Sequence, residues 1–439
     1  MRSRAWLALT LVVAGCALPL ASRLEPVDSF VARHWRAPLA PQGPAPARYS
    51  TLEASLAPES CGTCHPAQLA DWRTSTHATS MGPGIVGQLV EMLATDPRAA
   101  LACQHCHAPL AEQAPLRPDT LAANPDFDPA LRARGIPCAA CHVRGHERFG
   151  PPRRDGTLAG GVPRETLPHG GVTRTPAYLA SEFCRECHQF APGGYALEGK
   201  LLQDTYNEWK ASRFAAAGVQ CQDCHMPDRR HLWRGIHDPQ MVRRGLTIRV
   251  VEDAPAPGRV AARLVVESTG VGHRFPTYVT PIVVLRAELI DGAGRVIAGT
   301  REEHRIGREV TLDLERERAD TRLAPGQRAE LPYARALEGG AAGARFSVVV
   351  YPDAFYTAFF ETLLRQGAGR GEADIRAALA DARASAFTVV ESVTRPRSAR
   401  CGRRRRAGAR PPSSRPPAPR SPPRPARSGA RSAARPARS

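Results

Sequence analysis

Cys221-Gln-Asp-Cys224-His225 is one of five copies of the pattern CxxCH, and these copies dominate the interpretation of the chain. The other copies are Cys61-Gly-Thr-Cys64-His65, Cys103-Gln-His-Cys106-His107, Cys138-Ala-Ala-Cys141-His142 and Cys184-Arg-Glu-Cys187-His188. The pattern is typical of covalent attachment of a c-type haem. The two thiols bind the porphyrin as thioethers, and the following His becomes the proximal iron ligand. The sequence therefore predicts five covalently bound haem c groups.

Other uses of cysteine explain the pattern less well. A zinc site needs Cys and His in paired sets, and such sets do not explain why every copy ends in His. The five copies use ten of the 12 cysteines and leave Cys16 and Cys401. We therefore expect no framework of disulfide bonds. Haem would also supply apolar surface in a chain with only 6% aromatic residues.

The net charge of +18 is unevenly distributed. Residues 395–439 contain 15 Arg and no Asp, Glu or Lys, which leaves the rest of the chain with 18 minus 15, or +3. A basic, nucleic-acid-binding protein is therefore not indicated. The last segment, rich in Arg and Pro, has no hydrophobic periodicity and is predicted to be disordered. A frameshift in a GC-rich gene is the favoured explanation, and an arm that binds anionic surfaces is the alternative.

The N-terminus indicates export. Arg2 and Arg4 precede an apolar run from Ala5 to Gly15 that is short for a transmembrane helix. The run ends in Val13-Ala14-Gly15-Cys16, which resembles a bacterial lipobox, so residues 1–21 are predicted to be a signal peptide with Cys16 as the lipidated residue. Cleavage near Ala21 and an uncleaved anchor are the alternatives. All three export the chain, and the protein is expected to be periplasmic or attached to the outer membrane of a Gram-negative bacterium.

Composition divides the rest of the chain into three segments, which together predict a mixed fold class. Residues 22–58 are rich in Pro and Ala and are predicted to be a linker. Residues 59–245 hold all five motifs and are expected to form a mostly α-helical and irregular region packed around haem. Residues 246–394 carry short alternating apolar runs, which favour an Ig-like β-sandwich. The expected strands are 246–252, 260–268, 282–290, 295–299, 309–314, 328–333, 345–351 and 387–391, with helices at 353–364 and 372–384.

A short internal repeat lies within the haem region. Trp72 and Trp209 each begin a W-x-x-S pattern. The second pattern leads into Gly-Val-Gln before Cys221, much as Gly-Ile-Pro precedes Cys138. The repetition is consistent with duplicated haem-binding units.

Nine histidines lie outside the proximal positions, and some of them should bind the far side of each iron. The predicted distal ligands are His77, His146, His169, His231 and His273. His77 ends a helix-like segment, and His146 lies too near His142 to reach the same haem, so it should bind a neighbouring one. His231 and His237 are expected to supply one ligand between them. His273 lies in the β-domain, on a loop stiffened by Gly272 and Pro276.

Several motifs resemble the multihaem c-type cytochrome family that includes the tetrahaem electron acceptor of hydroxylamine oxidoreductase. They are C-G-T-C-H-P at 61–66, W-x-x-S-x-H-A at 72–78, the CxxCH followed four residues later by His146, and Gly-Val-Gln-Cys-Gln-Asp-Cys-His-Met-Pro at 218–227. The likeness covers about residues 59–245. Residues 272–277, 320–327 and 351–356 look like the C-terminal β-domain of some periplasmic multihaem cytochromes. Tyr278 differs, because that loop has Gly in the family.

The resemblance implies close-packed haems that pass electrons. The favoured hypothesis is therefore an exported pentahaem electron carrier with bis-His haems, working between other cytochromes or quinol-oxidising membrane proteins. The alternative is an enzyme, a reductase of hydroxylamine or of a small nitrogen or sulfur oxyanion. That chemistry needs an open iron position beside acidic, basic or cationic groups. The uniform His ending of all five motifs favours the electron carrier.

Overall fold

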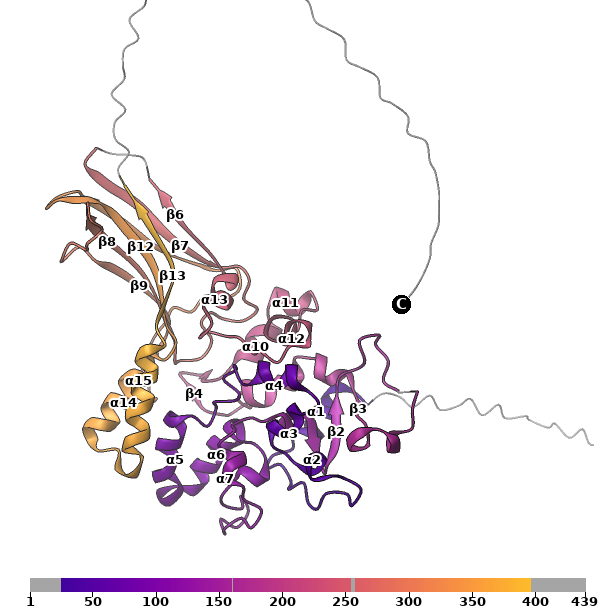
Figure 1. The fold of residues 1–439 in the computed structure, drawn as a ribbon. Coiled ribbons are helices and arrows are strands. Elements are labelled where there is room, and N and C mark those ends of the chain that lie inside the picture. Colours follow the sequence, from indigo (N-terminus) through magenta and orange to yellow (C-terminus); the bar gives the residue numbers. More distant parts are fainter. Residues whose placement is uncertain (1–24, 160, 254–256, 396–439) are drawn as a thin grey trace, which may run out of the picture. The chain divides into compact units, whose positions relative to one another are not determined.

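The computed structural model describes residues 25–159, 161–253 and 257–395 (Figure 1). The predictions for the signal peptide with Cys16, and for the Arg-rich tail beyond Arg395 with Cys401, lie outside these residues. Among the helices of the described residues, none is long and apolar enough to cross a bilayer.

Short helices separated by turns carry the five CxxCH motifs, together with two small sheets. Pro often occupies the first turn of these helices, where its missing N–H would have no helical acceptor anyway. The helices are α1 (Val27–His34), α2 (Thr51–Ala54), α3 (Pro58–Gly62), α4 (Pro66–Trp72), α5 (Pro83–Thr95), α6 (Pro97–His107), α7 (Pro129–Arg132), α8 (Cys138–His142), α9 (Glu182–His188), α10 (Thr205–Lys210), α11 (Arg213–Ala216), α12 (Cys221–His225) and α13 (Pro239–Gly245). The short strands are β1 (Val143–Arg144), β2 (Glu147–Gly150), β3 (Thr173–Arg174), β4 (Ala196–Leu197) and β5 (Lys200–Leu201).

The segment expected to be a linker contributes to the folded core. Helix α1 buries Phe30 and Val31, and Trp35 and Leu39 follow it into the same apolar cluster. This cluster also contains Ala139 and Ala140 from the third motif. Residues 25–58 therefore differ from the expected linker, because these four apolar side chains are buried against the haem region.

Two antiparallel sheets follow the haem region, as the alternating apolar pattern predicts. One has the strand order β10-β9-β8-β12-β13 and the other β11-β7-β6. The strands are β6 (Leu246–Glu252), β7 (Arg259–Ser268), β8 (Ile282–Asp291), β9 (Glu302–Val310), β10 (Glu317–Asp320), β11 (Arg328–Ala336), β12 (Ala341–Tyr351) and β13 (Phe387–Thr394).

The two sheets share one hydrophobic core. Even-numbered residues of β7 (260–266) and of β12 (344–350) face this core, as do odd-numbered residues of β8 (283–289). Such a period of two is the geometry of a strand with one buried face. The fold is thus of mixed class, with helices and several antiparallel sheets, while the Ig-like topology remains a prediction.

Two of the expected strands differ from the structure. Residues 292–299 form turns, in which Gly294 and Gly299 have positive φ values of 81° and 75°, and only an isolated bridge joins Ile290 to Val296. Residues 309–314 contain only the end of β9, whose earlier part was not expected as a strand. Strand β10 was also not expected.

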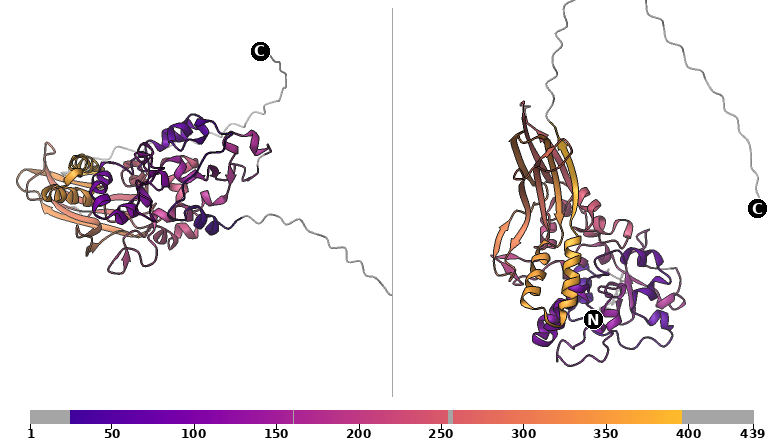
Figure 2. Two further views of the ribbon diagram at one scale, coloured as in Figure 1. Left: turned by 90° about the horizontal axis from the view of Figure 1, so that it is seen from below. Right: turned by 60° about the vertical axis from the view of Figure 1, so that its left-hand side comes forward.

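Helices α14 (Ala354–Gln366) and α15 (Glu372–Ala384) lie between β12 and β13, close to the expected ranges. Helix α15 packs against α5 of the haem region. Figure 2 shows α14 and α15, in orange to yellow, beside the purple helices of the haem region. The approach is close, since a Cβ atom on Gly371 would lie 2.0 Å from the Gly87 carbonyl oxygen. Glycine is therefore required at this crossing.

A buried arginine joins the β-domain to the β4–β5 hairpin of the haem region. The Arg308 side chain has no exposed surface and pairs with Glu317 at 2.8 Å. It also donates hydrogen bonds to the carbonyl oxygens of Leu201 (2.7 Å) and Lys200 (3.1 Å). The pairing and the hydrogen bonds together offset the cost of burying its charge.

Candidate functional site

Four of the five motifs lie at the C-terminal end of a short helix. The proximal His is the last helical residue of α6, α8, α9 and α12. In the first motif, α3 ends at Gly62 and His65 precedes α4. Residues three and four apart lie on one face of a helix. The two thiols and the imidazole of a motif can therefore reach one flat group from the same side.

The two W-x-x-S segments of the internal repeat each make an equivalent hydrogen bond. The indole Nε1 of Trp72 donates to the carbonyl oxygen of Ile136 at 2.8 Å. The indole of Trp209 donates to that of Val219 at 2.9 Å. Each acceptor lies two residues before a motif's first cysteine. The two W-x-x-S segments thus hold the start of the third and fifth motifs in the same way.

Backbone carbonyl groups orient several of the motif imidazoles. The Nδ1 atom of His107 lies 2.7 Å from Ser80 O, that of His142 lies 2.8 Å from Phe149 O, and that of His225 lies 2.6 Å from Arg234 O. A carbonyl oxygen only accepts, so each Nδ1 carries the proton and Nε2 keeps its lone pair. Metal-binding histidines are fixed by this kind of second contact.

Three predicted distal histidines lie opposite proximal ones. The ring centroids are 6.4 Å apart for His77 and His188, 6.2 Å for His142 and His231, and 6.3 Å for His225 and His273. Metal–nitrogen bonds are about 2 Å long, so two imidazoles on opposite sides of one iron have centroids about 6 Å apart. The interplanar angles are 39°, 41° and 12° in the same order.

Burial keeps these imidazoles neutral. It lowers the pKa of His77 to about 3 and that of His142 to about 4. Burial also lowers the pKa of His188, His225 and His273. Neutral imidazole is the form that binds a metal, so the rings need not lose a proton before ligation.

Thiols from different motifs lie in contact. Hydrogen bonding between side chains links Cys61 with Cys138, Cys106 with Cys187, and Cys184 with Cys221. The first motif is thus next to the third, the second next to the fourth, and the fourth next to the fifth. This adjacency would bring the attached groups close together.

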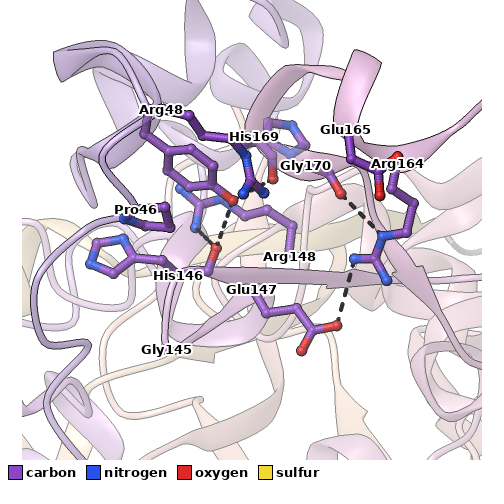
Figure 3. Close-up of a pocket in the computed structure, with 11 residues that line it drawn as sticks. Pro46, Arg48, Gly145, His146, Glu147, Arg148, Arg164, Glu165, His169 and Gly170 are labelled. Carbon is purple, nitrogen blue, oxygen red and sulfur yellow. Dashed lines mark hydrogen bonds and ion pairs between the residues drawn. The ribbon is translucent and has the colours of Figure 1, made fainter.

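The first motif lies near a pocket that contains two further predicted ligands (Figure 3). His146 is 6% exposed, and its Nε2 lies 2.9 Å from Gly43 O, while the buried Nδ1 has no partner. His169 has the opposite arrangement, with Nδ1 3.1 Å from Gly171 O. Burial lowers the pKa of His169, and Arg148 and His65 add smaller effects; His65 influences the pKa of His142 and of His231 in the same way.

The second motif has tyrosines near it. Burial raises the pKa of Tyr278 well above its usual value, with smaller contributions from Tyr356, Cys103 and Cys106. Burial also raises the pKa of Tyr356, which is again influenced by Cys103. Within the described residues, no imidazole ring is opposed to that of His107 as in the three pairs.

Several other histidines have different surroundings. His237 contacts the Asp353 carboxylate at 3.0 Å, so of the two alternatives it is His231 that lies opposite a motif. His34 is buried and contacts the carbonyl oxygen of Cys141. Trp233, Tyr278 and Tyr356 were not predicted as site residues. Only the departure of Tyr278 from the family loop was a signal in the sequence.

The donor set suits haem better than a bare ion. Among the described residues, no group of three or more His, Cys, Asp or Glu could hold a metal ion. A porphyrin supplies four ligands itself and needs only two axial ones, which the opposed imidazoles would provide. The ten motif cysteines are all free, as thioether attachment requires.

Comparisons with known proteins agree with this chemistry. The model of the family described as cytochrome c554 and c-prime matches residues 60–143, which contain the first three motifs. The fold is similar to that of a penta-heme cytochrome c552 from Thermochromatium tepidum, with a TM-score of 0.53 and 18% identity over 79% of this chain and 100% of that chain. No curated protein matches the sequence. With the five motifs, these likenesses support a multihaem c-type cytochrome.

Proposed function

We propose that the chain is an exported pentahaem c-type cytochrome that transfers electrons between respiratory partner proteins. The observation that carries this proposal is the set of three opposed imidazole pairs, at the separation that two axial ligands of one iron require. Haem bound there supplies the redox chemistry, and the chain's residues orient the ligands and exclude water. Bis-His ligation also favours a lower potential than His/Met ligation does.

Intact mass and electron paramagnetic resonance (EPR) together test this function. Protein matured with a cytochrome c assembly system should exceed the polypeptide mass by five porphyrins. The oxidised protein should show low-spin haem for at least the three paired sites. A mass gain of four or fewer would mean that one motif does not bind haem, and high-spin iron at the paired sites would contradict the ligand assignment.

The pocket of Figure 3 supports a distal ligand for the first haem from either His146 or His169. His146 offers a buried Nδ1 without a partner, whereas His169 offers Nε2. Separate His146→Ala and His169→Ala variants distinguish the two. The true ligand is the one whose loss converts one low-spin haem to high-spin, and the other variant serves as its control.

Lipidation at Cys16 and export are proposals that rest on the N-terminal sequence. The Cys16→Ser variant should be released as soluble, haem-loaded protein from the membrane fraction. Membrane association that persists in this variant would require another anchor.

The second motif favours a further candidate function, reduction of hydroxylamine or of a small nitrogen or sulfur oxyanion. The observation is the pair of partly buried tyrosines near Cys103, in place of an opposed imidazole. The raised pKa of Tyr278 keeps its hydroxyl protonated, so it can donate a hydrogen bond to a bound oxyanion. The electrons would come from the donor protein through the other haems.

Ligand binding tests this second function. A high-spin EPR signal that disappears when nitrite or hydroxylamine is added would support it, and Tyr278→Phe should then weaken that binding without changing the low-spin signals. An oxidised protein with five low-spin haems, inert to both compounds, would leave electron transfer as the function.

A further inference from the structure

One tryptophan contacts two of the proposed distal ligands. The Trp233 ring lies 4.7 Å from the His77 ring at an angle of 52°, and 5.2 Å from the His231 ring in an edge-on arrangement of 83°. His77 is opposed to His188 of the fourth motif, and His231 to His142 of the third. A single side chain therefore touches the ligand pairs of two haem sites.

Among the described residues, neither of these two distal rings makes a hydrogen bond of good geometry, although the Arg229 backbone lies beside the His231 ring. The Nδ1 atom of His231 is buried without a partner, and among the described residues no hydrogen bond reaches the His77 ring. His273 differs, because its Nδ1 lies 2.8 Å from Arg274 O. An axial imidazole without such a contact can rotate about its bond to the metal. Packing must then set the ring plane, and Trp233 supplies that packing to both rings.

The backbone holds Trp233 in an uncommon conformation. Its φ is +42°, and Asp228 and Arg229 also have positive φ values, of 55° and 62°. A bulky residue in the left-handed region is an outlier that persists only where its surroundings enforce it. The side chain is thus held in this place against the preference of its own backbone.

An ion pair holds the loop that carries Trp233 on the helix that leads to His77. The buried carboxylate of Asp71, on α4, accepts hydrogen bonds from Arg230 Nε at 2.9 Å and from His231 N at 3.1 Å. The side chain of Arg234 reaches Thr74 at 3.4 Å. The two distal ligands and the tryptophan between them therefore belong to one connected unit.

We propose that Trp233 is a positioning residue shared by the third and fourth haem sites, which fixes the planes of both distal imidazoles. The proposal rests on the proposed bis-His cytochrome function. Ligand-plane angle governs the g-value anisotropy of low-spin haem, so a change at Trp233 alters two EPR signals together. The His225–His273 pair, at 12°, has its own hydrogen bond and remains unchanged.

EPR of fully loaded, oxidised Trp233→Leu protein tests the proposal. Two of the low-spin signals should shift together while the signal of the near-parallel pair stays in place. Trp233→Phe keeps an aromatic face and should restore both signals toward their original g-values. Phe346→Leu is the matched control, because Phe346 is a fully buried aromatic residue in the core of the two large β-sheets and contacts neither His77 nor His231. It should leave both signals unchanged.

The outcomes separate this proposal from the function on which it rests. Unchanged signals in Trp233→Leu, or equal shifts of all signals, would overturn the role of Trp233 and leave the bis-His assignment intact. Fewer than five haems, or high-spin iron at these sites in the unaltered protein, would overturn the function instead. If the Trp233→Leu protein fails to bind haem, EPR of the Asp71→Asn variant provides the test instead. Loosening the loop should shift the same two signals, and the absence of a shift would overturn the proposal.

Discussion

His273 connects the β-domain to the chemistry of the haem region. It lies between β7 and β8, yet its ring is 6.3 Å from that of His225 in α12, and its Nδ1–H donates a hydrogen bond to Arg274 O. In the proposed function the β-domain would donate an axial ligand through His273, and it would then be part of the electron-transfer unit rather than a separate docking module.

We expect His273→Ala to open one coordination position. One low-spin haem should become high-spin and its potential should rise, because the second imidazole no longer stabilises the oxidised iron. EPR and a spectroscopic redox titration measure both effects. His304→Ala, on β9, is the control and should change neither. An unaltered spin state in His273→Ala, with five haems bound, would refute this ligand.

Asp320 predicts a pH dependence of stability. Burial raises its pKa, but Arg322 and Lys200 outweigh burial, so the pKa in the folded protein lies below its ordinary value. A lowered carboxyl pKa stabilises the fold above the unfolded-state pKa of about 4, and this contribution is lost as the pH falls through the folded pKa.

Asp320→Asn should therefore lower the free energy of unfolding at pH 7 and have less effect near pH 3. Denaturant unfolding of the haem-loaded protein at the two pH values measures the difference. Asp381→Asn, which removes an exposed carboxylate on α15, is the control. An equal loss at both pH values in Asp320→Asn would mean that its charge is not what stabilises the fold.

At the residue scale, spacing identified the motif residues but not their partners. CxxCH is a local pattern, so its five histidines can be assigned from adjacent residues alone. The distal ligands come from distant parts of the chain, as with His77 and His188. Their pairing depends on how α4 and α9 pack, which the sequence pattern does not contain. The contact of Trp233 with His77 is equally non-local.

At the scale of secondary-structure elements, strand β9 shows why some strands could not be predicted from the sequence. Its sequence, EEHRIGREV, lacks the apolar alternation of the other strands because it buries the charged Arg308. The Arg308 side chain forms an ion pair with Glu317 on β10 and donates a hydrogen bond to a carbonyl oxygen of the β4–β5 hairpin. Burial of a charge is possible only with such partners, and they lie outside the strand. By contrast, β6 and α15 followed local periodicity and match the expected ranges.

Arg308→Ala should destabilise the haem-loaded protein by about 3 to 5 kcal/mol, the range for removing one partner of a buried ion pair. Glu317 and the hairpin carbonyl groups would be left without their donor. Denaturant unfolding measures the loss. The matched control is Arg305→Ala on the same strand, whose pairing with Glu309 is exposed and should contribute about 0 to 1 kcal/mol. Similar losses in the two variants would contradict the proposed role of Arg308.

For the whole molecule, the folded part should not need the Arg-rich segment. Strand β13 runs to Thr394, which pairs with Ala344 of β12, so a truncation must follow Arg395 to spare the sheet. We expect such a protein to retain its haem content, absorption spectrum and thermal stability, because no periodic apolar residue is removed. Loss of haem or of stability would show that the segment contributes to the fold.

The contacts between thiols of different motifs have a consequence for biogenesis. Cys61 meets Cys138, and Cys184 meets Cys221, once the chain is folded. In an oxidising compartment, adjacent thiols exchange readily into disulfides. A chain that folded first would thus close cross-links between motifs and block its own maturation. The order of assembly follows: the assembly machinery must modify the nascent, extended polypeptide, and folding must come after it.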